Sequence, residues 1–180
     1  KNYLLTKVNV NSRCHAHSAI KLFFKYTLGQ SRKFDYIEYA RKSNKSPIIL
    51  SEEEIQKLLS VIKNLKHFSV LILFYATGIR IGELLDLELS HIDRANMVIH
   101  IRNGKGGKSR QVTMKPKLLE ILEAYYRKYR PIKYLFENDS SHEQYTESSI
   151  RQFLKRYANQ AGIKKDVHPH LLRQIGRAHV

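Results

Sequence analysis

The chain has 180 residues, 42% of them hydrophobic, which is enough for one compact domain and an additional smaller piece. Its 32 lysines and arginines outnumber its 16 aspartates and glutamates, and the formal net charge of +16 favours a polyanionic partner, nucleic acid before an acidic membrane surface. One cysteine excludes an internal disulfide, and no apolar run approaches the roughly 18 residues of a membrane span, so we expect a cytoplasmic protein that does not cross a membrane.

The N-terminal part is predicted to contain one amphipathic helix and a linker. Apolar residues recur at helical spacing from Ala16 to Thr27, and Gly29 follows as a stop signal. Residues 30–47 are polar and basic and end in a proline, a composition typical of a connection between two folding units. We therefore expect one unit over residues 1–46 and a second that begins at residue 47.

The second unit begins with two predicted helices. Ser51 and Glu54 have the spacing of a capping box, which predicts a helix that starts at Ser51. Residues 68–76 are apolar on every side, so we predict a centrally buried helix. Gly78 should end this helix just before Arg80, which leads into a short helix.

Two strands and three more helices are predicted further along the chain. Residues 97–102 and 109–114 alternate apolar and polar side chains as half-buried strands do, and the glycine-rich segment between them predicts a hairpin turn. The remaining helices are expected over residues 118–129, over residues 150–161 with Gly162 as the stop, and from Pro169 onward.

Arg80 is the first candidate for chemistry. It follows an apolar run, and a guanidinium held there needs an anionic partner, because an unpaired buried charge costs several kcal/mol. Glu83 and Asp86 are close enough in sequence to supply that partner. Taken alone, Arg80 is therefore interpreted as part of an internal ion pair.

The predicted hairpin turn carries a second candidate, Lys105, among three glycines. Exposed backbone amides and an ammonium group could meet a phosphate there, although such a turn is commonly only solvated. The spacing does not match the phosphate-binding loop of nucleotide hydrolases, which excludes ATP binding by that motif.

The third candidate is the stretch "HPHLLR", in which His170 and Arg173 share one face of a helix that begins at Pro169. A group able to transfer protons thus adjoins a cation suited to phosphate. His168 and His170 lack the nearby cysteine or placed carboxylate of a zinc site, so we predict no metal.

Three stretches together resemble the signatures of the tyrosine recombinases, the family of phage integrases and Xer-type site-specific recombinases. They are "TGIRIGELLDL", "NGKGGKSRQVTM" and "HPHLLR", in the family's order and at compatible separations. The resemblance implies a mainly α-helical fold with a small antiparallel β-sheet, an α+β fold. It implies a catalytic domain over residues 47–173, and residues 1–46 would be the end of a helical core-binding domain with its linker.

The resemblance also implies how the candidates act. Arg80 and Arg173 would flank one scissile phosphate of duplex DNA, while a tyrosine attacks it and forms a 3′-phosphotyrosyl link. Lys105 would donate a proton to the departing 5′ oxygen, and His170 would assist proton transfer. Glu83 would orient these groups.

Further implied properties concern DNA and assembly. Lys108 and Arg110 would bind DNA, and no metal or nucleotide cofactor is implied. The whole protein would come from a bacterium or phage, act at the nucleoid and assemble as a tetramer on paired DNA sites.

The sequence departs from the family pattern after Arg173, where a His/Trp box and the nucleophilic tyrosine are missing. The last tyrosine, Tyr157, lies on a predicted amphipathic helix and is interpreted as a core residue, so no nucleophile is assigned. We expect a truncated, catalytically inactive piece. The string "IGRAHV" can be encoded by a sequence like a common sequencing-library adapter, so residues 174–180 are predicted to be a non-native tail.

Three alternatives stay open at this point. A recombinase-like protein could grip DNA without cutting it. A basic helical RNA-binding protein would leave the ordered set of Arg80, Lys105, His170 and Arg173 unexplained. Type IB topoisomerases share the chemistry, but the linker and N-terminal helix resemble a recombinase more closely.

Overall fold

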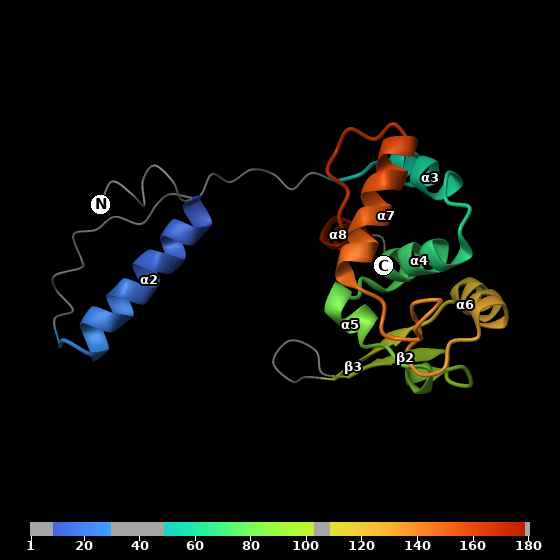
Figure 1. Cartoon of the computed structure of the whole chain (residues 1–180), viewed down its shortest axis with the longest axis horizontal. Helices are drawn as coiled ribbons and strands as arrows, with labels where there is room; N and C mark the ends of the chain where they lie inside the picture. The colour runs from blue at the N-terminus through green and yellow to red at the C-terminus, as the bar shows by residue number, and fades with distance from the viewer. Residues whose placement is uncertain (1–8, 30–48, 103–108, 179–180) are drawn as a thin grey trace. The chain divides into compact units, whose positions relative to one another are not determined.

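The computed structural model describes residues 9–29, 49–102 and 109–178, and of the helix that ends at residue 178 it describes side chains only up to residue 174. Contacts within the chain divide it into two units, residues 1–47 and 48–180 (Figure 1). The predicted hairpin turn that carries Lys105 and Lys108 lies outside the described residues.

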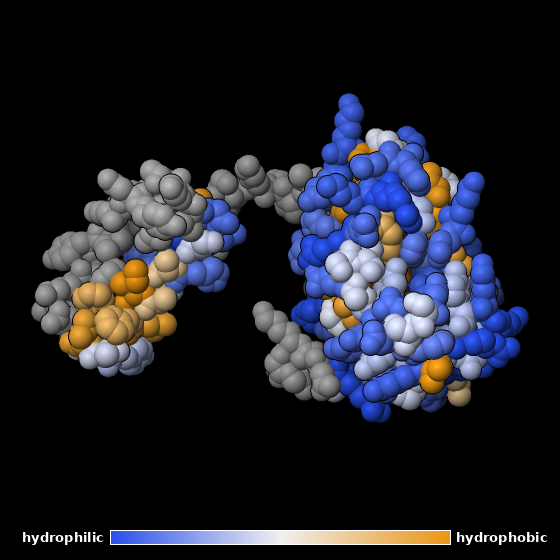
Figure 2. Space-filling model, viewed as in Figure 1, coloured by the Kyte–Doolittle hydropathy of each residue, from blue (hydrophilic) through white to orange (hydrophobic). Residues whose placement is uncertain are grey.

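The first unit contains one described helix, α2, Val10–Tyr26. It begins six residues before the predicted start, because the Asn9 side chain accepts a hydrogen bond of 2.9 Å from the Ser12 amide and caps the helix there. No residue of α2 is buried, and its apolar residues gather toward its C-terminal end, where Leu22 and Phe23 are each more than half exposed (Figure 2).

The second unit opens with α3, Glu52–Ser60, and the predicted capping box at its start is confirmed. The Ser51 amide donates to Glu54 Oε2 at 2.7 Å, and the Glu54 amide donates to Ser51 Oγ at 3.2 Å. The next helix, α4, spans Leu65–Thr77 and starts earlier than predicted, because the Asn64 side chain caps it.

Helix α4 is central, as its apolar sequence predicted, and it packs against α6, Pro116–Tyr129, and α8, Pro169–Ala178. Val70, Leu71, Leu73 and Phe74 are completely buried. α4 ends at Gly78, whose φ of 57° is a left-handed conformation that glycine adopts at little cost. Helix α5, Ile81–Leu85, follows directly.

The predicted hairpin strands form a three-stranded antiparallel sheet in the order β1-β2-β3. Its strands are Ile92–Asp93, Val98–Ile101 and Arg110–Thr113, and Ile101 pairs with Arg110 across the hairpin stem. β2 begins one residue later than predicted because Met97 has a φ of 54°, outside the range of an extended strand. A 3₁₀ turn, η2 (Leu89–His91), leads into β1.

Helix α7, Glu147–Gln160, contacts α3, α5 and α8. The predicted core position of Tyr157 on this helix is confirmed, since the residue is 6% exposed.

The predicted architecture, mainly helical with a small antiparallel sheet, is the one observed. Within the described residues, no helix is long and apolar enough to span a membrane.

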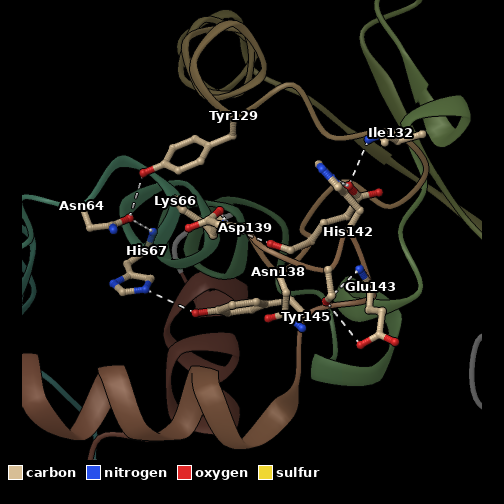
Figure 3. A network of polar contacts seen from close by, with 12 residues as sticks. Asn64, Lys66, His67, Tyr129, Ile132, Asn138, Asp139, His142, Glu143 and Tyr145 are labelled. Carbon is tan, nitrogen blue, oxygen red and sulfur yellow. Dashed lines mark hydrogen bonds and ion pairs between the residues drawn. The ribbon is translucent and has the colours of Figure 1, made fainter.

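A polar network anchors α4 to the segment before α7 (Figure 3). The Lys66 side chain is buried, donates to the Glu137 carbonyl oxygen at 2.6 Å and forms an ion pair with Asp139. The rings of Tyr129 and Tyr145 lie 5.0 and 5.4 Å from the Lys66 ammonium. Cation–π contacts and hydrogen bonds thus offset the cost of burying this charge.

His67, beside Lys66, belongs to the same network, in which Figure 3 shows it joined to Tyr145, and it also ties α4 to α7. Its Nδ1 lies 3.0 Å from the Tyr157 hydroxyl, its Nε2 lies 3.3 Å from the Tyr145 hydroxyl, and its ring stacks on Phe153 at 4.2 Å. Burial, together with the nearby charges of Arg156 and Lys66, lowers the pKa of His67 to about 4. A neutral His67 therefore helps to hold the two helices together near neutral pH.

Candidate active site

Arg80 is positioned by the end of one helix and the start of the next. Gly78 ends α4, Ile79 is buried, and Arg80 occupies the N-cap position of α5. The Arg80 amide donates to Glu83 Oε2 at 2.9 Å, and Arg80 Nη1 donates to Glu83 Oε1 at 2.6 Å. The ion pair predicted for Arg80 is thus formed with Glu83, whereas Asp86 accepts from Gln144 at 2.9 Å.

The Arg80 side chain is less buried than the sequence predicted. Its 39% exposure differs from the buried environment expected from the preceding apolar run, because the left-handed backbone at Gly78 ends α4 and changes the direction of the chain before Arg80. The guanidinium group therefore reaches the surface while Glu83 holds one side of it. This arrangement leaves Arg80 accessible to a ligand from outside.

Glu83 is the buried carboxylate at the centre of this site, with a side chain 5% exposed. Arg110 Nη1 and Nη2 donate to its two oxygens at 3.0 and 2.9 Å, in addition to the bonds from Arg80. Burial would raise the pKa of Glu83, but the hydrogen bonds from the Arg80 backbone, the Arg80 side chain and Arg110 outweigh it and lower that pKa. Glu83 is consequently ionised at neutral pH.

Three residues predicted from two separate motifs line one pocket of about 470 Å³: Arg80 from the first, His170 and Arg173 from "HPHLLR". The pocket lies where the α4–α5 junction meets α7 and the start of α8. Its complete lining is Ile79, Arg80, Ile81, Arg151, His168, Pro169, His170 and Arg173. Since Arg80 and Arg173 are 93 positions apart (173 − 80), only the folded chain brings them together.

The two histidines of "HPHLLR" differ in their surroundings. His168 Nδ1 accepts a hydrogen bond of 3.1 Å from the Leu171 amide, so this side chain caps α8. His170 is exposed, with its Nε2 3.3 Å from Gln174 Nε2 and its ring stacked on His168 at 6.3 Å. His170 is therefore the histidine available to a ligand.

Arg151 lines the same pocket and was not among the predicted site residues. It lies on α7, where its Nε donates to Glu147 Oε1 at 2.8 Å and its side chain remains 59% exposed. In the sequence it is one of several basic residues on the polar face of an amphipathic helix, so no local signal distinguishes it. It adds a third guanidinium to the pocket lining.

The sequence profile of the phage integrase family matches residues 49–179, well over half of the chain. The chain belongs to the phage integrase family. The resemblance to tyrosine recombinases is thereby confirmed, together with the fold class.

Among curated relatives, a protein of Sinorhizobium fredii, y4qK, named as an integrase/recombinase, is 36% identical over 97% of this chain and 57% of its own length. A second protein of that organism, y4eF, named likewise, is 36% identical over 92% of this chain and 66% of its own length. Tyrosine recombinase XerA of Pyrococcus furiosus is 28% identical over 100% of this chain and 62% of its own. This integrase-family chain thus spans between 57% and 66% of the length of these relatives.

Solved structures of the family share the fold. A crystal structure of XerA recombinase matches 99% of this chain and 65% of its own with a TM-score of 0.68 at 28% identity. The Tn1549 transposon integrase, in complex with circular intermediate DNA, matches 99% of this chain and 68% of its own with a TM-score of 0.82. Its sequence identity of 16% supports a shared fold alone.

Proposed function

We propose that this chain is part of a site-specific DNA recombinase that cleaves and rejoins strands through a 3′-phosphotyrosyl intermediate. The observation that carries this proposal is the meeting of Arg80, His170 and Arg173 in one pocket. The names of its relatives, which include tyrosine recombinases, and the DNA complex of the Tn1549 integrase support it.

The chemistry of the pocket fits a phosphodiester. When a tyrosine oxygen attacks the phosphorus, negative charge grows on the two non-bridging oxygens, and fixed guanidinium groups stabilise that charge. Arg80 and Arg173 would act in this way, since the planar fork of arginine matches phosphate oxygens. Glu83 would hold Arg80 in place through its two hydrogen bonds.

Proton transfer completes the proposed reaction. As the tyrosine oxygen gives up its proton to His170 or to solvent and bonds to phosphorus, the bond from phosphorus to the 5′ oxygen breaks, and that oxygen takes a proton from Lys105. His170 would donate a hydrogen bond to the phosphate or assist the proton transfer. Lys108 would contribute to DNA binding, and the chemistry requires no metal or nucleotide cofactor.

The nucleophile would come from outside residues 1–180. Tyr157, the last tyrosine of the sequence, is 6% exposed and hydrogen-bonded to His67, which makes it unsuitable for attack on DNA. We propose that the whole protein supplies a tyrosine after Arg173 and acts on duplex DNA as a tetramer on paired sites, at the nucleoid of a bacterial host.

A suicide DNA substrate with the protein's recombination site tests the proposal. The 180-residue chain should form no covalent adduct on a denaturing gel, whereas the chain extended by its genomic continuation should form one. Arg80→Ala and Arg173→Ala should each abolish that adduct, because each removes a transition-state contact worth about 3 kcal/mol. Arg127→Ala, which changes an exposed arginine of α6 outside the pocket, is the matched control.

The results separate the alternatives. An extended chain that binds DNA without any adduct would identify a non-catalytic DNA-binding module instead. An adduct formed by the 180-residue chain itself would assign a nucleophile within it and refute the proposed truncation.

We propose that residues 174–180 are a non-native tail. Helix α8 continues to Ala178 and the family match reaches residue 179. Neither observation tests whether the codons for residues 174–180 come from the genome. Sequencing the genomic DNA across this point tests it: different codons after Arg173 are expected, and an uninterrupted match to "IGRAHV" would contradict the prediction.

A further inference from the structure

Arg110 differs from Arg80 and Arg151 in that it does not line the pocket and uses both of its terminal nitrogens on the two oxygens of one buried carboxylate. It is the first residue of β3, at the stem of the hairpin, and its side chain is 35% exposed. Both of its terminal nitrogens donate to Glu83, at 3.0 and 2.9 Å. A direct contact with DNA, as expected from the sequence, would have to compete with this bidentate pair.

The two arginines share Glu83 unequally. Arg110 engages both carboxylate oxygens with its fork, whereas Arg80 places one guanidinium nitrogen, Nη1, on Oε1 and its backbone amide on Oε2. A carboxylate has about four lone-pair sites, and these four hydrogen bonds occupy them. Because Arg110 fills two sites and the Arg80 amide fills a third, one site remains for the Arg80 guanidinium group.

The sharing of Glu83 by Arg80 and Arg110 leaves a net positive charge beside the pocket. Glu83 carries one negative charge and contacts two guanidinium groups, so the three side chains together keep one positive charge. Without Arg110, the buried carboxylate would draw Arg80 into a bidentate pair that neutralises it, since a buried carboxylate is costly to leave half satisfied. Both the charge and the second terminal nitrogen of Arg80 would then be withdrawn from the pocket.

We propose that Arg110 is a positioning residue, which occupies Glu83 so that the guanidinium group of Arg80 stays directed at the phosphate. Arg110 also links the stem of the lysine hairpin to the start of α5, because Arg110 belongs to β3 and Glu83 belongs to α5. This inference rests on the proposed function, in which Arg80 contacts the scissile phosphate.

The test compares Arg110→Lys and Arg110→Gln in the extended chain that forms the covalent adduct. Lysine keeps the charge but cannot form the two parallel hydrogen bonds, so it separates positioning from simple electrostatic attraction. The rate of adduct formation at saturating DNA should fall about ten- to a hundredfold in both variants, because misplacing a catalytic group by about 1 Å costs a factor of that order. DNA affinity and its salt dependence should stay within about twofold of wild type.

A double-mutant comparison with Glu83→Gln isolates the route of the effect. If Arg110 acts through Glu83, adding Arg110→Gln to Glu83→Gln should cause little further loss, so the two losses should not multiply. Multiplying losses would overturn the inference. Thermal unfolding of each variant identifies any that fails to fold, and the charge-preserving Arg110→Lys is the one least prone to that failure.

Two other results would overturn the positioning role of Arg110. A variant Arg110→Lys that cleaves at the wild-type rate, while Arg80→Ala is inactive, would overturn the positioning role and leave the proposed function standing. So would a direct DNA contact, visible as weaker affinity and a reduced salt slope for Arg110→Gln, with a normal rate at saturation. If Arg80→Ala cleaves normally, the proposed function itself fails.

Discussion

At the scale of single residues, the pocket combines cations that are held in different ways. Arg80 is fixed by the buried carboxylate of Glu83, whereas Arg151 is held by Glu147 one turn away on the same helix. An exposed ion pair of this second kind contributes at most about 1 kcal/mol. Arg151 can therefore exchange Glu147 for a phosphate at little cost.

Arg151→Gln is expected to weaken duplex DNA binding a fewfold at about 0.1 M salt, because a phosphate contact is lost. The slope of log affinity against log salt concentration should become shallower by about 0.9. Arg94→Gln is the matched control, since Arg94 is 69% exposed, is paired with Glu123 and lies outside the pocket. Equal slopes for the two variants would exclude Arg151 from the DNA contact surface.

His67 is expected to make the stability of the second unit depend on pH. Its pKa is about 4 in the folded chain and about 6.5 when unfolded, so the unfolded state binds a proton between these values and the folded state does not. The free energy of unfolding should thus decrease as pH falls from 6.5 to 4, by about 1–2 kcal/mol after allowance for partial exposure.

Urea unfolding at several pH values measures this dependence. His67→Gln removes the titrating group and should flatten the curve in that window. The same slope in the variant and the wild type would assign the effect to other groups.

At the scale of elements, the α4–α5 junction determines where Arg80 lies. α4 is held by the Lys66 and His67 network at one end and stops at Gly78 at the other. The left-handed backbone at Gly78 turns the chain, so that α5 starts at once and Glu83 can reach back to the Arg80 amide. A few local features of the backbone therefore orient the guanidinium group.

Gly78→Ala should lower the free energy of unfolding by about 1–2 kcal/mol, because a Cβ atom disfavours a φ of 57°. Gly82→Ala is the matched control on the adjacent helix: a Cβ there would meet no atom within 4 Å. Alanine at that helical position should be neutral or stabilising by up to about 1 kcal/mol. Chemical denaturation of both variants checks the pair, and equal effects would contradict the role given to Gly78.

At the scale of the whole molecule, charge is the dominant property. The formal net charge of +16 is spread over both units, and residues 1–47 alone carry ten basic and two acidic residues. Such a surface attracts polyanions over distances limited by the salt-dependent screening length. The pocket would then act on DNA that the charge has already captured.

The 180-residue chain is expected to bind duplex DNA with an affinity that drops severalfold or more between about 50 and 200 mM salt. The physical reason is the release of counterions from each phosphate that a lysine or arginine neutralises. Mobility shifts at a series of salt concentrations measure the effect, with single-stranded DNA of equal length as the comparison. Binding that does not respond to salt, or no binding at low salt, would contradict the proposed role of the charge.

The sequence by itself determined the local elements and the family signatures. The capping box at Ser51, the stop at Gly78 and the two strands of the hairpin depend on neighbours within a few residues, so short patterns predict them. Helix starts were less accurate, as in α2, because one polar cap such as Asn9 gives no periodic signal.

The family resemblance already implied that Arg80 and Arg173 meet, and both line one pocket. Only the tertiary structure decided that Arg151 joins them from α7 and that Arg110 pairs with Glu83. These relations depend on how helices and strands pack, and the packing is set by many long-range contacts that no local pattern encodes. The exposure of Arg80 is a second example. Its apolar neighbours in the sequence predicted burial, but the left-handed backbone at Gly78 changes the direction of the chain, and the guanidinium group reaches the surface.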